Sequence, residues 1–428
     1  MLTKKEIVSF HSRENLGESQ KRVGIELELF CIDSHTSKRV PYQSYNGHVS
    51  VQQLFEYLKA HEEYSDVDMA KTFTLVKGKS KVTLEPGAQV EFGSSPQENL
   101  TDLFQELEAY LAVLRRLTEE FGVSWLDVAY FPIGDPCDVP LLPSARSEII
   151  DSYWQRTGHL ARDLMRYTTS IHVSFDYNNE SDLAEKIKRA LLLKPILLFI
   201  SANSRIRAGR DTGLRSFRTM TYRDTDAPRM GTPGPESLWT SGQWTLDGYV
   251  EKVLQAPSIF SVGTSSYTES SHEPFVFSLK DASFEDYLSH LATMYTDIRV
   301  RQYFEIRYLD NPGVQLIPGL VIVLHKLIYD DAAWGTFARY IPYTFAEVPA
   351  ITDLLNSVSE ASSDYWEHKL LRPLEGFLLD LQTDLQVALS QHLNRVLDRV
   401  VNYRMRDELP DLSSDTRIIS HFKSLFPF

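Results

Sequence analysis

Apolar and polar residues alternate along several short segments of this chain, which predicts β-strands with one buried face and one polar face. In one of these segments the alternation is broken at Gly78 and again at Pro86 and Gly87, which predicts a hairpin followed by a turn and a further strand. The alternating segments are residues 23–32, 71–95, 123–132, 167–177 and 303–311.

Other segments carry apolar residues at the spacing of an amphipathic helix. The clearest one opens with Ser95 and Pro96 as cap and first turn, and it ends at Gly122. Pro195 falls inside another helical segment, where we expect it to cause a kink. Helices are expected over residues 3–15, 50–63, 95–121, 146–164, 180–204, 283–296 and 315–331, and over most of the chain from 346 onward.

These strands and helices are mixed without regular βαβ alternation, which predicts an α+β fold with a largely antiparallel sheet. We expect a core over residues 1–345 and a helical C-terminal region over 346–428, with a single domain over 1–428 as the alternative. The sequence leaves open whether the C-terminal helices cap the sheet or form a contact between copies of the chain. Residues 201–245, rich in Gly, Pro, Ser and Arg, are expected to form an ordered functional loop.

Composition is that of a globular protein, with 44 Lys and Arg against 58 Asp and Glu and a formal net charge of −14. This charge argues against a general affinity for nucleic acid or for an anionic membrane. The longest apolar stretch, residues 190–202, is too short to span a bilayer. Cys31 and Cys137 are the two cysteines, so no disulfide framework is expected, and a reducing cytoplasm is the predicted location.

The polar faces of the predicted strands carry an unusual number of carboxylates. Because residues two apart in a strand share a face, Glu26 and Glu28 lie together, opposite their apolar neighbours. One such strand fits a solvated antiparallel sheet, but a solvated face is normally mixed in sign and rich in Lys, Thr and Ser, as in "KGKSKVT". Across the strands, the polar residues singled out in this way are Glu26, Glu28, Glu85, Gln89, Glu91, His172, Glu305 and Arg307.

Of these residues, Arg307 is the only fixed cation that the pattern identifies. Neighbouring carboxylates about 7 Å apart repel each other by roughly 2 kcal/mol at an effective dielectric constant of about 20. Gathering five of them on one sheet is therefore unfavourable unless cations bind. Carboxylate oxygens without cysteine favour Mg²⁺ or Mn²⁺ over zinc. The pattern predicts divalent-metal chemistry, and Mg²⁺ in such a setting usually accompanies a nucleotide phosphate.

No P-loop, Rossmann fingerprint or nucleophile elbow occurs in the chain. Instead, residues 201–231 hold a dense run of arginines in an otherwise acidic protein. A surface loop with solvated or ion-paired arginines would explain this run, and a nucleic-acid site is less well supported because aromatic residues are few. The functional alternative is recognition of phosphate and carboxylate groups. The arginines are Arg205, Arg207, Arg210, Arg215, Arg218, Arg223 and Arg229.

Five motifs together carry a family resemblance. "GIELE", "LEPGAQVEFGSSP", "MRYTTSIHVSFDY", "SANSRIRAG…LRSFR…DTDAPRMG" and "FEIRYLDNPG" resemble, in order and approximate spacing, the glutamate–cysteine ligase type 2 family. The resemblance covers roughly residues 22 to 320. It implies a glutamine synthetase-like core, in which a curved antiparallel sheet binds ATP with two or three Mg²⁺ ions.

The resemblance also implies roles for individual residues. Arg307 resembles the arginine that contacts the ATP phosphates, and Arg218 and Arg229 resemble arginines near phosphate or the substrate carboxylate. Gln89 and His172 would belong to the metal–nucleotide face, with a purely structural role as the alternative for His172. The implied metal ligands are Glu26, Glu28, Glu85, Glu91 and Glu305.

Three positions depart from the usual family motifs. Ala88 stands in "EPGAQ" where the family has glycine, Arg205 stands where the family has proline, and Phe304 replaces a smaller residue. The change at Ala88 is expected to be benign. We expect Arg205 to lie near the entry of the amine substrate, which puts the identity of that amine in doubt.

The implied activity is an ATP-dependent carboxylate–amine ligase that joins the γ-carboxylate of glutamate to the amine of cysteine through an acyl phosphate. Positioning and electrostatics supply most of the catalysis in such a reaction, so no protein nucleophile is needed. Two alternatives remain open. One is a ligase with the same mechanism and another amine or acid, and the other is a non-catalytic protein that binds nucleotide or metal. The expected partners are small molecules, and neither nucleic acid nor a membrane is among them.

Overall fold

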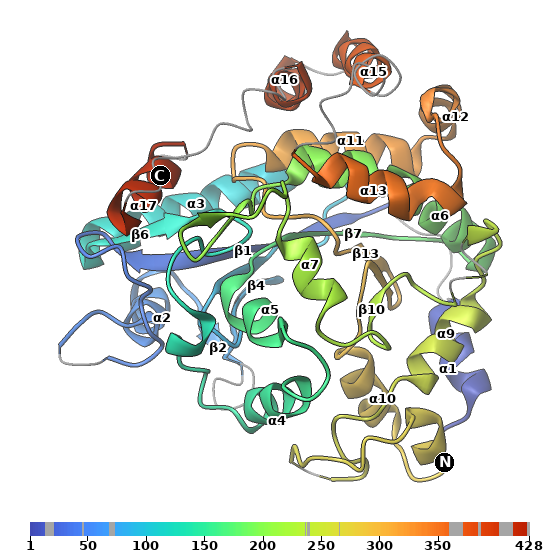
Figure 1. The fold of residues 1–428 in the computed structure, drawn as a ribbon, viewed down its shortest axis with the longest axis horizontal. Helices are drawn as coiled ribbons and strands as arrows, with labels where there is room; N and C mark the ends of the chain where they lie inside the picture. Colours follow the sequence, from blue (N-terminus) through green and yellow to red (C-terminus); the bar gives the residue numbers. More distant parts are fainter. Residues whose placement is uncertain are drawn as a thin grey trace.

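The computed structural model describes residues 1–12, 21–44, 47–67, 73–235, 237, 240–264, 266–358, 371–383, 387–401 and 414–425. Its centre is a nine-stranded antiparallel sheet, which confirms the expected α+β fold. Strand β1 lies in the middle and pairs with β7, β5 and β6, and the order along the sheet is β12-β13-β7-β1-β5-β4-β3-β2 (Figure 1). The strands are β1 Val23–Asp33, β2 Ser65–Asp66, β3 Leu75–Lys77, β4 Ser80–Leu84, β5 Val90–Gly93, β6 Val123–Leu126, β7 Ile171–Phe175, β12 Ile298–Val300 and β13 Phe304–Ile306.

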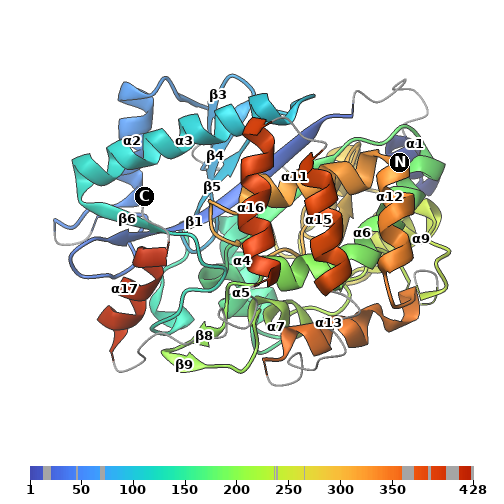
Figure 2. The same ribbon diagram turned by 90° about the horizontal axis from the view of Figure 1, so that it is seen from above.

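Helices cover one face of this sheet in two layers (Figures 1 and 2). The inner layer packs on the apolar side chains of the strands, so that Leu27 of β1 shares one continuous core with Leu107, Leu197 and Leu324 of three different helices. Above it, α16 packs on α11 and α15 packs on α16. The helices of this side are α3 Leu100–Phe121, α6 Glu180–Ser201, α11 Ile317–Tyr329, α12 Asp331–Phe337, α13 Val348–Asn356, α15 Arg372–Thr383 and α16 Val387–Val401.

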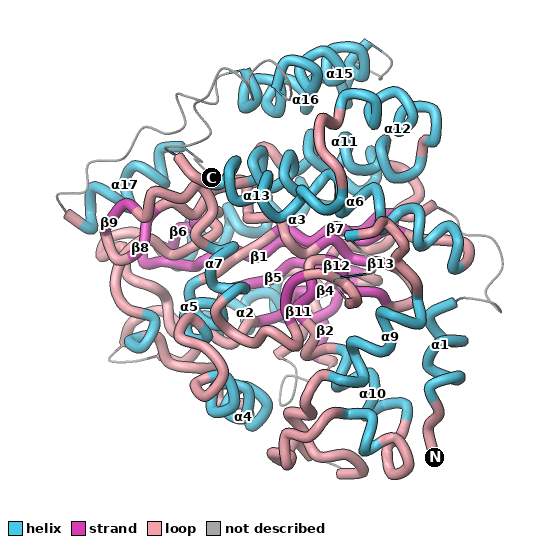
Figure 3. Tube along the Cα trace, turned by 45° about the vertical axis from the view of Figure 1, so that its right-hand side comes forward, coloured by secondary structure: helices cyan, strands magenta, loops and turns pink. Residues whose placement is uncertain are grey.

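The opposite, polar face of the sheet is covered by shorter helices and long loops (Figure 3). Two small two-stranded sheets lie among them, β8 Ile206–Arg207 with β9 Arg210–Asp211, and β10 Met230–Gly231 with β11 Tyr295–Thr296. The remaining helices are α1 Lys4–Ser12, α2 Val51–His61, α4 Ala145–Trp154, α5 Ala161–Tyr167, α7 Arg218–Arg223, α9 Leu246–Gln255, α10 Phe284–Leu291 and α17 Asp415–Leu425. No helix in the described ranges combines the length and the apolar character that a membrane crossing needs.

The predicted elements are present, but several boundaries differ. Helix α3 begins later than expected, because the side chain of Asn99 rather than Ser95 accepts a hydrogen bond from the first turn. The expected helix over 146–164 is two helices, α4 and α5, and the segment 123–132 is a strand only as far as Leu126. Pro195 lies inside α6, and the helix continues on both sides of it.

Candidate functional site

The register of the sheet brings the predicted carboxylates together. Glu26 of β1 lies opposite His172 of β7, and Glu28 lies opposite Glu91 of β5. Glu305 of β13 lies opposite Ser174 of the same β7. Because directly opposed residues of antiparallel strands point to the same face, these side chains share one side of the sheet. The strand phase predicted from sequence is therefore confirmed.

Two overlapping groups of potential metal ligands result. The first consists of Glu26, His172 and Glu305, and His172 Nδ1 lies 3.3 Å from a carboxylate oxygen of each glutamate. Its Nε2 lies 2.8 Å from the hydroxyl of Ser170. Burial, followed by the charge of Arg307, lowers the pKa of His172 to about 4. The imidazole is therefore neutral at pH 7 and keeps a lone pair that a metal ion can use.

The second group consists of Glu28, Glu91 and the same His172. Burial raises the pKa of Glu91 to about 8, and the charge of Glu26 acts in the same direction. The pKa of Glu28 is also raised, by burial and by the charges of Glu85 and Glu91. Both side chains resist ionisation because the structure places them together in a region of low polarity. A bound divalent cation would remove that cost.

Glu26, Glu28, Glu91 and His172 of these two groups line a cavity of about 220 Å³, and Glu305, which contacts His172, does not line it. Glu85, Gln89, Arg218 and Arg307 line it as well, so it gathers most of the residues singled out from the sequence. The amide nitrogen of Gln89 donates hydrogen bonds to the carbonyls of Met165 and Thr168, whereas its buried Oε1 has no hydrogen-bond partner among the described residues. A donor set of carboxylate oxygens, one free amide oxygen and one neutral imidazole nitrogen fits Mg²⁺ or Mn²⁺.

The prediction that Arg307 is the only fixed cation beside these acids is wrong, because Lys81 and Arg299 also contact them. Arg299 and Arg307 both contact Glu305, at 2.9 Å and 2.5 Å, and Lys81 Nζ lies 3.0 Å from Glu26 Oε1. Lys81 belongs to "KGKSKVT", a segment whose composition predicts a solvated face. Its spacing of two from Thr83, whose hydroxyl donates to Glu91, is the signal that could have placed it in the site.

The two other predicted arginines have different surroundings. Arg218 of α7 lines the cavity, but its guanidinium donates to the carbonyls of Leu309 and Arg307 and stacks over the ring of Tyr222. Arg229 does not line the cavity. It is fully buried and pairs with Asp226 at 2.8 Å. In this arrangement Arg229 is held by contacts with the protein, and its predicted role near phosphate or a substrate carboxylate stays a prediction.

Most of the arginine-rich segment 201–231 is likewise held by contacts with the protein. Arg207 pairs with Asp163, and Arg223 pairs with Asp353. Arg205 contacts Asp211 at 2.8 Å next to the β8–β9 hairpin and lines none of the cavities described here. The expectation that Arg205 stands near the entry of the amine stays a prediction. The ion-paired alternative accounts for this segment better than a phosphate site does, with Arg218 as the exception.

Alanine at position 88, where the family motif has glycine, has a conformational cost. Its φ of 61° lies in the left-handed region, where a non-glycine residue costs about 1 kcal/mol. Its methyl group is buried, which contributes about 0.8 kcal/mol in the opposite direction. Because the two effects nearly cancel, the expectation that the change is benign agrees with the energetics.

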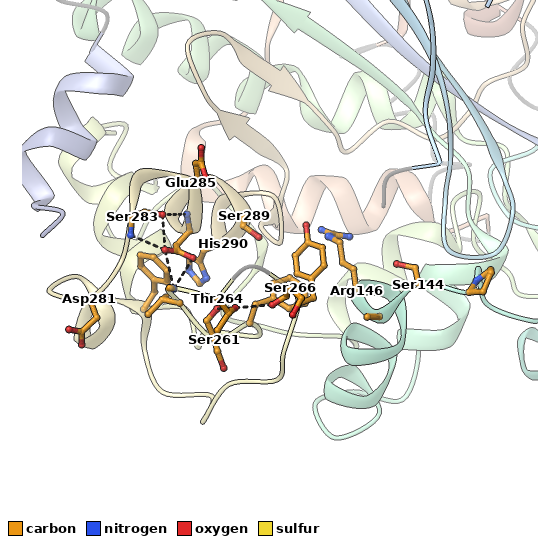
Figure 4. Close-up of a pocket in the computed structure, with 18 residues that line it drawn as sticks. Ser144, Arg146, Ser261, Thr264, Ser266, Asp281, Ser283, Glu285, Ser289 and His290 are labelled. Atoms are coloured by element: carbon orange, nitrogen blue, oxygen red, sulfur yellow. Dashed lines mark hydrogen bonds between the residues drawn. The ribbon is translucent and has the colours of Figure 1, made fainter. Parts of the chain in front are cut away.

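A second, larger cavity of about 570 Å³ (Figure 4) shares Arg146 with the acidic one. Arg146, in the first turn of α4, lines both cavities and was not singled out from the sequence. Its guanidinium approaches the ring of Phe260 at 5.8 Å and acts electrostatically on Glu85. The Arg146 guanidinium makes no hydrogen bond or ion pair with another described residue. It is therefore available to bind an anionic ligand where the two cavities meet.

Comparisons with known proteins identify the family to which this sequence is similar. The model of the family described as glutamate-cysteine ligase family 2 matches residues 22–362. The chloroplastic glutamate–cysteine ligase of Arabidopsis thaliana is 26% identical over 387 residues, which cover 84% of this chain and 72% of that protein. Chloroplastic glutamate–cysteine ligase A of Oryza sativa subsp. japonica is 27% identical over 409 residues, which cover 89% and 81%. Because these relatives are named as chloroplastic, the cytoplasmic location stays a prediction.

Among solved structures, the glutamate–cysteine ligase of Francisella tularensis, determined in complex with AMP, has a similar fold. The TM-score is 0.50 at 10% sequence identity, and the match covers 95% of this chain and 90% of that one. At this identity the likeness shows the fold alone.

Proposed function

Because this chain belongs to glutamate–cysteine ligase family 2, we propose that it is an ATP-dependent ligase that joins the γ-carboxylate of glutamate to the amine of cysteine. One observation carries the proposal. Carboxylates from three separate segments, Glu26 and Glu28, Glu85, and Glu91, converge with His172 on one cavity, and Arg307 lines the same cavity. A protein has no structural reason to gather buried acids that repel each other, whereas a nucleotide-dependent ligase needs them to hold metal ions.

The roles of the residues follow from their positions. Glu28, Glu85 and Glu91 line the cavity and would hold Mg²⁺, which when bound neutralises charge on the ATP phosphates. Glu26 and Glu305, which the resemblance also implies as ligands, already pair with Lys81 and with Arg299 and Arg307. Arg307 is fixed by Glu305, and its cation adds positive charge to the wall of the cavity where the transferring phosphoryl group would lie. Arg218 contributes a second buried cation, which is oriented by the carbonyl of Leu309.

The two substrates other than ATP would meet at Arg146. Among the described residues the Arg146 guanidinium has no hydrogen bond or ion pair, so it can bind a substrate carboxylate through two parallel hydrogen bonds. The glutamate side chain would then reach the acidic cavity, and the larger cavity gives the amine an approach to the activated carbonyl. Attack of the γ-carboxylate on ATP yields an acyl phosphate and ADP, and attack of the amine on this intermediate releases phosphate.

The test is a coupled measurement of product and intermediate. The purified protein is incubated with ATP, Mg²⁺, glutamate and a panel of amines that includes cysteine, and the products are identified by mass spectrometry. We expect release of phosphate that depends on glutamate and is fastest with cysteine. Hydroxylamine in place of the amine should trap the acyl phosphate as a hydroxamate. If no amine accelerates phosphate release and no hydroxamate forms, the ligase function is contradicted.

A further inference from the structure

Lys81 is a cation built into the carboxylate cluster. It lies on β4 directly opposite Gly93 of β5, and Gly93 in turn lies opposite Glu26 of β1. The three positions form one row across the sheet, with the glycine in the middle. The side chain of Lys81 extends along this row, so that its Nζ lies 3.0 Å from Glu26 Oε1 and 3.8 Å from Glu91 Oε1.

Gly93 provides the space for this arrangement. A Cβ atom placed on Gly93 would lie 2.5 Å from Cε and 2.9 Å from Cγ of Lys81. The stem of the lysine therefore passes directly over the glycine. Gly93 is not among the residues with positive φ, so its backbone does not require glycine. We conclude that the missing side chain, rather than conformational freedom, is what this position supplies.

Resident cations are distributed unevenly over the two ligand groups. In the first group, Glu26 contacts Lys81, and Glu305 contacts Arg299 and Arg307. In the second group, Glu28 has no contact with a lysine or arginine among the described residues, and Glu91 has only the distant contact with Lys81. The first group is thus neutralised by the protein itself, whereas the second is not.

We propose that the ammonium group of Lys81 takes the place of one divalent cation beside Glu26, and that divalent ions bind this cluster through the carboxylates of Glu28 and Glu91. This inference rests on the proposed function only in assuming that the cluster binds divalent ions. An ammonium group carries one charge and donates hydrogen bonds, so it can neutralise Glu26 without the ordered coordination that Mg²⁺ demands. The chain would then need one divalent ion fewer than a cluster without this lysine.

The experiment counts Mn²⁺ ions bound per chain, by electron paramagnetic resonance of the free ion, with Mn²⁺ alone as the probe. Lys81→Met keeps the stem over Gly93 and removes the charge. We expect this variant to bind one more Mn²⁺ per chain than the wild type. We also expect Mn²⁺ to raise its thermal midpoint more than it raises that of the wild type, because the ion replaces the missing ammonium. Lys79→Met, at an exposed position two residues away, is the matched control and should equal the wild type.

Gly93→Ala is a second route to the same state and keeps the lysine. The added methyl group displaces the flexible Lys81 stem, so this variant should also gain Mn²⁺ binding beside Glu26. If Lys81→Met does not fold, Gly93→Ala carries the test. Equal Mn²⁺ counts in the wild type and in the folded variants, zero included, overturn the proposal. Dipeptide synthesis by the wild type, measured on the same preparation, reports separately on the ligase function.

Discussion

At the scale of single residues, Glu91 combines a functional role with a cost in stability. It is buried, it faces Glu28 across the sheet, and it receives one neutral hydrogen bond, from Thr83. Two buried carboxylates without a close cation destabilise the folded chain until a metal ion binds. The same property makes the pair a strong ligand set, so function and stability make opposite demands at this position.

Glu91→Gln therefore separates the two effects. We expect ligase activity to fall by about 100-fold or more, because a charged metal ligand is lost. In the absence of divalent ions, however, the variant should unfold at a higher temperature than the wild type. Steady-state kinetics and thermal unfolding with a chelator check both parts. Glu108→Gln, at an exposed position of α3, is the control. A variant that keeps full activity would show that Glu91 does not hold the metal.

Arg146 allows a test of substrate binding. We expect Arg146→Ala to raise the KM for glutamate by about 10- to 100-fold, the usual effect of losing a charged hydrogen-bonded pair. The KM for ATP should change much less, because Arg146 lies where the two cavities meet and makes no ion pair with a proposed metal ligand among the described residues. Initial-rate kinetics with each substrate varied in turn provide the measurement. Arg115→Ala, on an exposed part of α3, should leave every constant unchanged. An equal rise in both KM values would contradict this role.

How much of the site is visible in the sequence depends on where its residues come from. The phase of Glu26 and Glu28 follows from the alternation within a single strand, so their shared face could be predicted. Lys81 and Arg299 reach the same face from other strands, and their contacts depend on register, which the side chains of one strand do not reveal. The burial of Arg229 depends on an ion pair inside a loop, and no periodic pattern records such a contact.

At the scale of elements, the contact between α11 and α16 is set by one glycine. Gly319 of α11 lies under the backbone of α16, and a Cβ atom there would lie 2.4 Å from the carbonyl oxygen of His392. Helices approach this closely only where a side chain is missing. Helix boundaries were less predictable than the helices themselves. Asn99 and Ser95 are both good cap residues, and packing rather than local preference decides between them.

Gly319→Ala and Gly335→Ala form a matched pair at this scale. Both glycines lie within helices, but the position of a Cβ atom at Gly335 in α12 has no neighbour within 4 Å. We expect Gly335→Ala to stabilise the protein by about 0.5 to 1 kcal/mol through helix propensity. Gly319→Ala should destabilise it by about 1 to 3 kcal/mol, because α16 must move away. Denaturant unfolding measures both changes, and equal shifts for the two variants would contradict the close contact.

At the scale of the whole molecule, the open question from the sequence is whether residues 346–428 form a separate unit. Leu355, Leu378 and Val396 of this region share the main buried cluster with residues of the central strands. Ile418 and Ile419 of α17 belong to a second cluster, together with Phe30 of β1 and Leu126 of β6. Helix α13 packs on α6, and α17 contacts β6 near the far end of the sheet. These contacts favour the single-domain alternative, because separate domains would each have a core of their own.

A chain that ends at residue 345 tests this organisation. Removing the C-terminal helices would expose the outer faces of α6 and α11, whose apolar residues form part of the main core. We therefore expect the shortened chain to unfold at a much lower temperature or to aggregate, and to lose ATP-dependent activity although every proposed site residue is retained. Calorimetry of the full chain should show a single transition, which Gly319→Ala shifts as a whole. A shortened chain that keeps its stability and activity, or a second transition in the full chain, would instead establish a separable C-terminal domain.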